Sequence, residues 1–278
     1  MKIHNHRLIQ ADGAPVPFVA TPNLGGVIQP EYLVMHYTAG SSADSSVAWL
    51  SNPQARASAH LVIGRDGGIT QLVPFNRSAW HAGKSQWDGR SGLNNFSIGI
   101  ELDNAGNLER VGSRWLSRVS KRAYADDDVL IANHKQDRPG TPPSGWHEYT
   151  EAQIEAALAV GLLLMQRYKL KEVLGHEDIA PGRKTDPGPA FPMASVRSRL
   201  QGRAADQADI FLASAVLNIR SGPGANNPAL PGSPLPLNTR LAVLEKQALW
   251  WRVDVLEAQS DEAVEGWVHS RFLKPEMV

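Results

Sequence analysis

The amino-acid sequence predicts an α+β protein, with a mixed central β-sheet flanked by helices and a small all-β barrel after it. Three observations support this fold class. Short apolar runs bounded by turn residues fill much of the first 100 positions, which is typical of buried strands. A long amphipathic helix is expected after residue 150. Beyond about residue 203 only short strands and turns are expected, so we predict one domain over residues 1–203 and another over 204–278.

Apolar runs place the first strands. Residues 32–36 form a continuous apolar run that closes on His36, so we expect a buried strand that carries a histidine at its carboxyl end. Residues 60–63 and 69–73 flank an Arg-Asp-Gly-Gly sequence, which is typical of a hairpin turn. These segments are predicted to pair as neighbouring strands.

The run 97–102 alternates strictly between apolar and other residues. Such alternation predicts a strand with one face in the core. Its other face carries Ser97, Gly99 and Glu101. We expect open space in front of the two small residues, and therefore a carboxylate that faces a cleft.

Helices are predicted from their capping residues. Residues 150–153 read Thr-Glu-Ala-Gln, a capping box that starts a helix running to about Lys169. Residues 41–44 offer caps for a shorter helix, and residues 194–200 are expected to form a closing helix. Residues 1–30 contain four prolines, so we expect an irregular arm that packs on the core and holds one short strand at most.

Composition and charge narrow the class of protein. The chain has 278 residues, 28 lysines and arginines against 28 aspartates and glutamates, and no cysteine. This neutral balance gives no electrostatic signature of nucleic-acid binding, and disulfides are excluded. The first residues lack the apolar core of a secretory signal, so we expect synthesis as a cytoplasmic protein without a transmembrane segment, and any export by another route. The sequence leaves the oligomeric state open.

Residues 175–188 form a polar stretch that contains two prolines and three glycines. This composition predicts a fixed surface loop. His176 and Asp186 in this loop are suitable zinc ligands, and His36 at the end of its predicted strand is the best third one. Three nitrogen or oxygen ligands with a fourth position left for water are typical of catalytic zinc.

His36, His176 and Asp186, with the sequence motifs around them, resemble the zinc-dependent N-acetylmuramoyl-L-alanine amidases, and within these the AmpD branch. The resemblance covers roughly residues 32–200 and implies the fold, the zinc ion and the bond that is cleaved. Residues 204–278 resemble a bacterial SH3-type domain, through Leu-Asn-Ile-Arg-Ser-Gly-Pro and Gly-Trp-Val. The amidase motifs are His36, the Ser58–His60 and Trp80–Gly83 segments, Ser97–Glu101, Gly175–Glu177 and Arg183–Gly188.

Two residues are predicted to carry out the chemistry beside the metal. Glu101 is the expected general base, which passes a proton from water to the departing nitrogen. Lys184 is the expected stabiliser of the oxyanion. The resemblance assigns the same roles to both positions. The alternatives are a surface carboxylate, a solvated lysine and, for Asp186, a residue that only caps a turn.

Further residues are candidates for the substrate groove. His60 and His81 could be a fourth ligand or substrate contacts, and we favour groove-lining or supporting roles because a fourth ligand would close the zinc site. Trp80 and Trp87 either offer a flat apolar face to a sugar or peptide or pack in the core. Tyr37 replaces an asparagine common in AmpD proteins, and Arg90 lies in a segment that is less basic than in close AmpD relatives.

Other polar residues receive weaker predictions. Glu177 and Asp178 are expected to support the ligands. Residues 103–149 form a long polar segment that either walls the groove or is a solvated insertion. Histidines without a predicted specific role are His134 and His147 in that segment, and His4, His6 and His269 on the surface.

The sequence therefore predicts a zinc hydrolase that cleaves N-acetylmuramic acid, or its anhydro form, from L-alanine in peptidoglycan or muropeptides. Two alternatives remain open. The first is a peptidoglycan-binding protein on the same fold without catalysis. The second is a peptide amidase or metallopeptidase that acts on another substrate.

Overall fold

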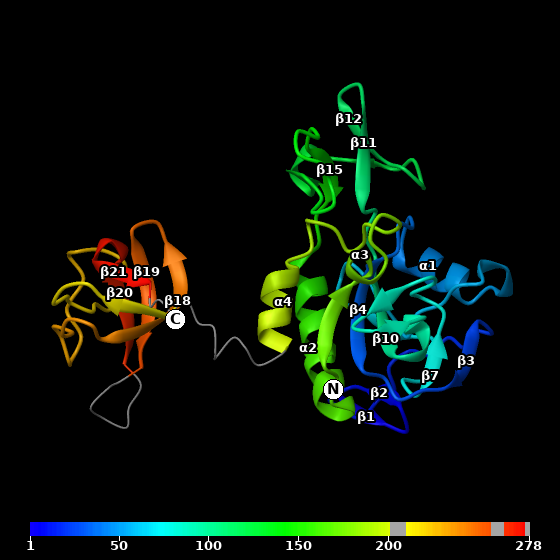
Figure 1. Cartoon of the computed structure of the whole chain (residues 1–278), viewed down its shortest axis with the longest axis horizontal. Helices are drawn as coiled ribbons and strands as arrows, with labels where there is room; N and C mark the ends of the chain where they lie inside the picture. The colour runs from blue at the N-terminus through cyan, green and yellow to red at the C-terminus, as the bar shows by residue number, and fades with distance from the viewer. Residues whose placement is uncertain (201–209, 257–263, 276–278) are drawn as a thin grey trace. The chain divides into compact units, whose positions relative to one another are not determined.

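The computed structural model describes residues 1–200, 210–256 and 264–275 (Figure 1). The chain divides into two compact units, Met1–Gln201 and Gly202–Val278. The predicted domain boundary between residues 203 and 204 lies outside the described residues. Within the described part, no helix is long and apolar enough to cross a membrane.

The first unit is built on a five-stranded sheet, and the prediction of a mixed sheet flanked by helices is confirmed. Its strand order is β16-β4-β10-β5-β6. The first four strands are parallel, and only the β5–β6 hairpin is antiparallel. Parallel strands place their carboxyl ends at one edge of the sheet, where ligand sites usually form. The bounds are β16 Glu172–Gly175, β4 Tyr32–Tyr37, β10 Ser97–Leu102, β5 Leu61–Ile63 and β6 Ile69–Gln71.

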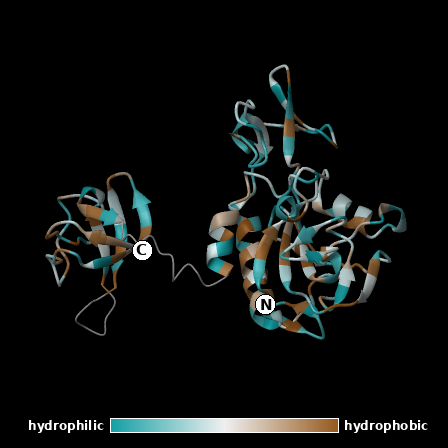
Figure 2. Cartoon of the chain, in the orientation of Figure 1, coloured by the Kyte–Doolittle hydropathy of each residue, from teal (hydrophilic) through white to brown (hydrophobic). Residues whose placement is uncertain are grey.

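Helices cover both faces of this sheet. On one face α2 (Glu151–Tyr168) and α4 (Met193–Leu200) pack on the apolar side chains of β4, β10 and β5, and Figure 2 shows the apolar residues along these elements. The Thr150 capping box starts α2 as predicted. The apolar periodicity of residues 154–165 predicts Leu162 on the buried stripe of this helix, but its side chain is exposed. The other face carries α1 (Ala43–Leu50) and the short α3 (His176–Ile179).

The segment 103–149 is a second sheet and not a long loop. It folds into five antiparallel strands in the order β13-β12-β11-β15-β14, which we call the inserted sheet. Its strands are short and interrupted, so alternation gave no clear signal. Their bounds are β11 Asn107–Val111, β12 Arg114–Ser117, β13 Ala123–Tyr124, β14 Val129–Ala132 and β15 Ser144–His147.

The amino-terminal arm is more regular than expected, because it contains three short strands. β1 (Lys2–His4) and β2 (Arg7–Ile9) form a hairpin, and β3 (Leu24–Val27) pairs with β7 (Arg77–Ala79). A further small hairpin joins two strands before β10. These are β8 Gln86–Trp87 and β9 Arg90–Ser91.

The second unit is a five-stranded antiparallel sheet in the order β20-β19-β18-β17-β21, and the all-β prediction is confirmed. Its core holds Ile219, Leu241, Val253 and Val268, all essentially inaccessible to solvent. Residues 215–224, which open this region, form only isolated bridges. The strands are β17 Ile210–Ala213, β18 Arg240–Gln247, β19 Trp250–Val255, β20 Glu265–His269 and β21 Leu273–Pro275.

Candidate metal centre and active site

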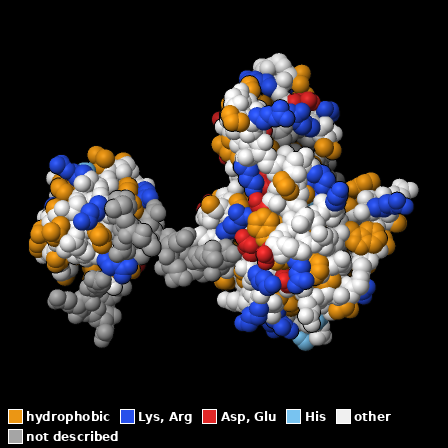
Figure 3. Space-filling model, viewed as in Figure 1, with side chains coloured by type: hydrophobic (Ala, Val, Ile, Leu, Met, Phe, Trp, Pro, Cys, Tyr) orange, Lys and Arg blue, Asp and Glu red, His pale blue; other side chains and the backbone are white. Residues whose placement is uncertain are grey.

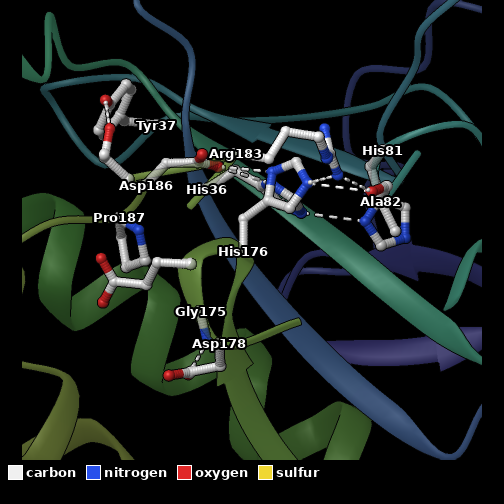
Figure 4. A network of polar contacts seen from close by, with 12 residues as sticks. His36, Tyr37, His81, Ala82, Gly175, His176, Asp178, Arg183, Asp186 and Pro187 are labelled. Carbon is white, nitrogen blue, oxygen red and sulfur yellow. Dashed lines mark hydrogen bonds and ion pairs between the residues drawn. The ribbon is translucent and has the colours of Figure 1, made fainter. Parts of the chain in front are cut away.

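Three potential metal ligands converge at the carboxyl ends of β4 and β16 (Figure 4). Nδ1 of His36 lies 2.9 Å from Nδ1 of His176 and 2.9 Å from Oδ2 of Asp186. Nδ1 of His176 lies 2.9 Å from the same carboxylate oxygen. All three side chains are buried. The structure thus brings together the three residues predicted as ligands from distant positions in the chain.

The register of the sheet explains this convergence. His36 on β4 lies directly opposite Glu101 on β10, and Gly175 on β16 lies opposite Met35. The next residue, His176, therefore emerges beside His36 at the same edge. Partners in adjacent parallel strands are about 4.8 Å apart and share a face, so three functional side chains form a row across neighbouring strands.

Hydrogen bonds orient both imidazole rings. Nε2–H of His176 donates to the backbone oxygen of Ala82 over 3.1 Å. Nε2 of His36 lies 3.0 Å from Nδ1 of His81. Nε2 of His81 lies 3.3 Å from Oγ of Ser97, whose hydroxyl donates to a backbone oxygen over 2.6 Å. That hydroxyl must accept from His81, so His81 Nδ1 accepts the proton of His36.

This proton assignment makes the cluster suitable for a cation. A neutral imidazole carries one N–H, so each Nδ1 atom presents a lone pair to the carboxylate of Asp186. Ligand atoms around tetrahedral zinc lie about 3.3 Å apart, so the three atoms need to spread by only a few tenths of an ångström. Three lone-pair atoms this close repel one another without a positive ion. The donor set fits a divalent metal ion.

Burial and neighbouring charges favour this ligand state. Burial lowers the pKa of His36 to about 4, and the nearby His176 adds to the effect. Burial acts to raise the pKa of Asp186, but its close contacts with the His176 and His36 rings outweigh burial and hold that pKa well below its usual value. His36 is therefore neutral and Asp186 is ionised near pH 7.

Glu101 is a carboxylate without a hydrogen-bond partner. Its Oε2 atom is buried and has none among the described residues. Burial raises its pKa well above the usual value, and the charge of Asp186 acts in the same direction while Lys184 opposes it. A buried acceptor left unpaired is costly, which is typical of a functional group that awaits substrate or solvent.

The space expected beside Glu101 is filled. The sequence predicted open space in front of Ser97 and Gly99, but the ring of His81 occupies it. A β-carbon at Gly99 would overlap that ring. The small residues therefore make room for the histidine that orients His36, and His81 supports a ligand from behind.

A pocket of about 430 Å³ opens at this cluster. Glu101 and Lys184, the predicted oxyanion stabiliser, both line it. Of the substrate contacts predicted from the sequence, Tyr37, Trp80 and His81 line it, whereas His60 and Arg90 do not. Two indoles in its wall, Trp49 and Trp80, are partly exposed. Its lining includes Tyr37, Trp49, Ser58, Trp80, His81, Glu101, His176, Arg183, Lys184, Thr185 and Asp186.

The structure places two predicted substrate contacts elsewhere. His60 is fully buried, and its Nδ1 accepts the N–H of Gly99 while its Nε2–H donates to a backbone oxygen. Arg90 pairs with Glu31 and lines a different pocket. Trp87, offered as a second flat surface, donates its N–H to Glu172. The side chains of His60 and Arg90 therefore bind other partners and do not line the metal pocket.

A turn of the inserted sheet holds the ligand loop, and the sequence did not reveal it. Residues 134–136 follow β14, and we call them the brace turn. Nε2 of His134 lies 2.5 Å from Oε2 of Glu177, and Nζ of Lys135 lies 2.9 Å from Oε1 of the same carboxylate. Gln136 donates to the backbone oxygen of Glu177 over 2.8 Å. The prediction that His134 has no specific role is wrong.

Two further polar residues were missed or misread. Nδ1 of the buried His147 accepts the N–H of Ala105, so this histidine holds the start of the inserted sheet. Arg183 donates to the backbone oxygens of Ala82 and Lys84 over 2.8 and 2.7 Å. These hydrogen bonds connect the loop of residues 175–188 to the Trp80–Gly83 segment. Only its place in the loop motif indicated such a role in the sequence.

Comparisons with known proteins agree with this geometry. Residues 27–189, more than half of the chain, match the family model described as N-acetylmuramoyl-L-alanine amidase, and residues 215–274 match the bacterial SH3 domain model.

Two curated relatives are both from Escherichia coli (strain K12). The chain is 40% identical to 1,6-anhydro-N-acetylmuramyl-L-alanine amidase AmpD over 144 residues. This alignment covers 51% of this chain and 57% of AmpD. The chain is 37% identical over 169 residues to N-acetylmuramoyl-L-alanine amidase AmiD, which covers 58% and 49% respectively. The chain thus spans about half the length of these relatives. A crystal structure of an AmpD selenomethionine derivative aligns with a TM-score of 0.48 and 30% identity, over 73% of this chain and 98% of that one.

Proposed function

Because the chain belongs to the N-acetylmuramoyl-L-alanine amidase family, we propose that it is a zinc-dependent amidase. It cleaves the amide bond between N-acetylmuramic acid, or its anhydro form, and L-alanine in peptidoglycan or muropeptides. The observation that carries this proposal is the triangle of donor atoms from His36, His176 and Asp186, two of which, His176 and Asp186, line one pocket together with Glu101. The named activities of AmpD and AmiD are in accord with it.

His36, His176 and Asp186 would hold the zinc ion. When bound, zinc polarises a substrate carbonyl and lowers the pKa of water to about 7. The chain's own contribution is to fix the ligands. His81 and the backbone oxygen of Ala82 accept the outer ring protons of the two histidines, which sets the tautomer in which Nδ1 binds the metal.

Glu101 moves the proton. As general base it accepts a proton from the attacking water, whose oxygen bonds to the amide carbon. It then gives that proton to the nitrogen as the carbon–nitrogen bond breaks, so the products are the lactyl carboxylate and the free amine of L-alanine. Its raised pKa suits a group that must both accept and return a proton near neutral pH.

Lys184 stabilises the charge that develops on the carbonyl oxygen. It lines the same pocket and comes two residues before the ligand Asp186 in the chain. A fixed cation aimed at an oxyanion in a partly dry pocket typically contributes about 100- to 1000-fold in rate. Trp49 and Trp80 offer apolar surfaces against which a sugar ring packs.

The two parts of the chain have separate tasks in this proposal. Residues 1–203 form the zinc amidase domain, with the arm 1–30 and the insertion 103–149. Residues 204–278 form the bacterial SH3-type domain. Muropeptide or polymeric peptidoglycan is the partner proposed for the first domain, and the ligand of the second stays open.

The proposal is tested by the identity of the product. The purified chain is incubated with N-acetylmuramyl and anhydro-N-acetylmuramyl peptides, and mass spectrometry is expected to find free peptide that begins with L-alanine. Removal of metal with a chelator should abolish this release, and added zinc should restore it. Plain peptides without muramic acid should stay intact. Binding of muramyl peptide without any turnover by the zinc-loaded chain would instead identify a non-catalytic wall-binding protein.

A further inference from the structure

A second pocket adjoins the metal pocket and is walled by the inserted sheet. It has a volume of about 290 Å³ and shares Tyr37, Ala39 and Thr185 with the metal pocket. The hydroxyls of Tyr37 and Thr185 lie 2.8 Å apart at this shared border. A substrate held at the metal can therefore extend into the second pocket without leaving the protein surface.

One arginine in this pocket is held in place with its outer amino groups available. Nε of Arg118 donates to Oδ1 of Asn107 over 2.7 Å. Nδ2 of Asn107 in turn donates to Oγ of Ser144 over 2.8 Å and to the backbone oxygen of Gly145. Within the described residues, the two terminal nitrogens of Arg118 have no hydrogen-bond partner. The guanidinium is therefore oriented before any ligand arrives.

Arginine held in this way is suited to a carboxylate. Its two parallel N–H groups match the two oxygens of a carboxylate, which adds geometric selectivity to the attraction of charge. The rest of the lining offers an apolar wall, from Trp146 and Val119, and the hydroxyl of Ser144. Figure 3 shows Lys and Arg side chains gathered on the inserted sheet, at the top of the view.

The one carboxylate in the lining does not neutralise Arg118. Asp137 belongs to the turn after His134, and its Oδ2 accepts the N–H of His134 over 2.7 Å. Among the described residues, no ion pair joins Asp137 to Arg118. Outside the lining, Lys121 and, to a smaller extent, Arg118 lower the pKa of Glu109, but the hydrogen bond to Glu109 comes from Lys121. Arg118 therefore keeps its terminal N–H groups for an incoming acidic group.

We propose that this pocket is a subsite for the acidic stem peptide, and that Arg118 binds the free α-carboxylate of its γ-linked D-glutamate. This inference rests on the proposed amidase function. In such a peptide the acidic residue directly follows the L-alanine at the scissile bond, and the second pocket borders the metal pocket at Tyr37 and Thr185. The inserted sheet then selects substrates through a charge that lies outside the reacting amide.

Two matched substrates test this subsite. Both are N-acetylmuramyl tripeptides of sequence L-Ala-γ-D-Glu-L-Lys, one with a free α-carboxylate on the second residue and one with an α-carboxamide. The zinc-loaded full chain should show a kcat/KM about tenfold higher for the acid, because a two-pronged charged hydrogen bond is lost with the amide. In Arg118→Ala the acid-to-amide ratio of kcat/KM should fall toward one, mainly through KM.

Matched variants separate binding from folding. Arg114→Ala removes the same charge from β12, the strand that Arg118 directly follows, at an exposed position outside the pocket, and should leave the ratio unchanged. Arg118→Lys keeps the positive charge but lacks the two parallel N–H groups of arginine, and should give an intermediate acid-to-amide ratio of kcat/KM. A wild-type ratio near one, or an Arg118→Ala variant that loses activity equally on both substrates, would overturn the subsite. Failure to hydrolyse either substrate would refute the amidase function itself.

Discussion

The two ends of the central sheet both carry clusters of charged side chains, but the clusters differ in kind. At the amino ends of β4 and β16, Glu31 pairs with Arg90 over 2.7 Å and with Lys171 over 2.6 Å. The arginine and lysine side chains are 45% and 58% exposed. At the carboxyl ends, His36, His176 and Asp186 are buried and present lone pairs to one another.

The difference shows what marks a functional site in this molecule. The pocket at the amino ends is the larger one, about 560 Å³ against about 430 Å³, so size does not distinguish them. Its charges satisfy one another in contact with solvent, where ion pairs contribute little. The carboxyl ends hold a buried oxygen of Glu101 that has no hydrogen-bond partner among the described residues, and three ligand atoms that point at one another. Unsatisfied polar atoms at a buried edge indicate chemistry.

The largest effect is expected from Glu101→Gln. Gln keeps the shape but cannot accept and return a proton, so kcat should fall by about 100- to 10,000-fold. Metal content, measured by atomic absorption, should stay at that of the wild type because Glu101 is not a ligand. Retention of substantial turnover would assign the general base to another group.

The pH profile sharpens the role of Glu101. Burial and the charge of Asp186 raise its pKa above the ordinary 4.5, and only the ionised form accepts a proton. Wild-type kcat should therefore decline as pH falls through a value above 4.5. Lys184→Met removes a charge that lowers the pKa of Glu101. The residual kcat of this variant should therefore begin to decline at a higher pH than that of the wild type. An unchanged limb would contradict the assignment.

An intermediate effect, on zinc affinity, is expected at His81, which contacts Nε2 of His36. His81→Leu removes the acceptor for the ring proton of His36 and should weaken zinc affinity by about 10- to 100-fold, as loss of such a partner typically does. His81→Asn places an oxygen near the position of Nδ1 and should recover part of this loss. Competition with a chromophoric chelator measures both, and equal affinities in the two variants would assign His81 a packing role only.

The smallest effect is expected at the opposite end of the sheet. Glu31→Gln breaks two exposed ion pairs, which should change the free energy of unfolding by less than about 1 kcal/mol and leave kcat unaltered. Denaturant titration and the muropeptide assay measure these quantities. A large loss of activity would show that the two ends of the sheet are coupled.

The sequence predicted the sheet and the main components of the site because local patterns encode them. An apolar run closed by His36 and the strict alternation around Glu101 are readable along the chain. The same is true of the loop that holds His176 and Asp186. Each is a strand end or a fixed loop, which has a clear local signature.

Other features depend on contacts that no local pattern records. Gly99 was interpreted as open space, but it is small because the ring of His81 packs against it. Arg90 is near the motif in sequence, yet its hairpin delivers it to Glu31 at the far edge. The inserted sheet was interpreted as a loop because its strands are only two to five residues long, too short for alternation to be measured.

The brace turn makes the inserted sheet inseparable from the metal loop. The carboxylate of Glu177, adjacent to His176, is paired with His134 and Lys135 of the brace turn. Excising the insertion to recover a minimal amidase would remove both of these partners from a carboxylate that is folded to be paired. An engineer who trims or grafts this segment must therefore redesign residue 177 as well.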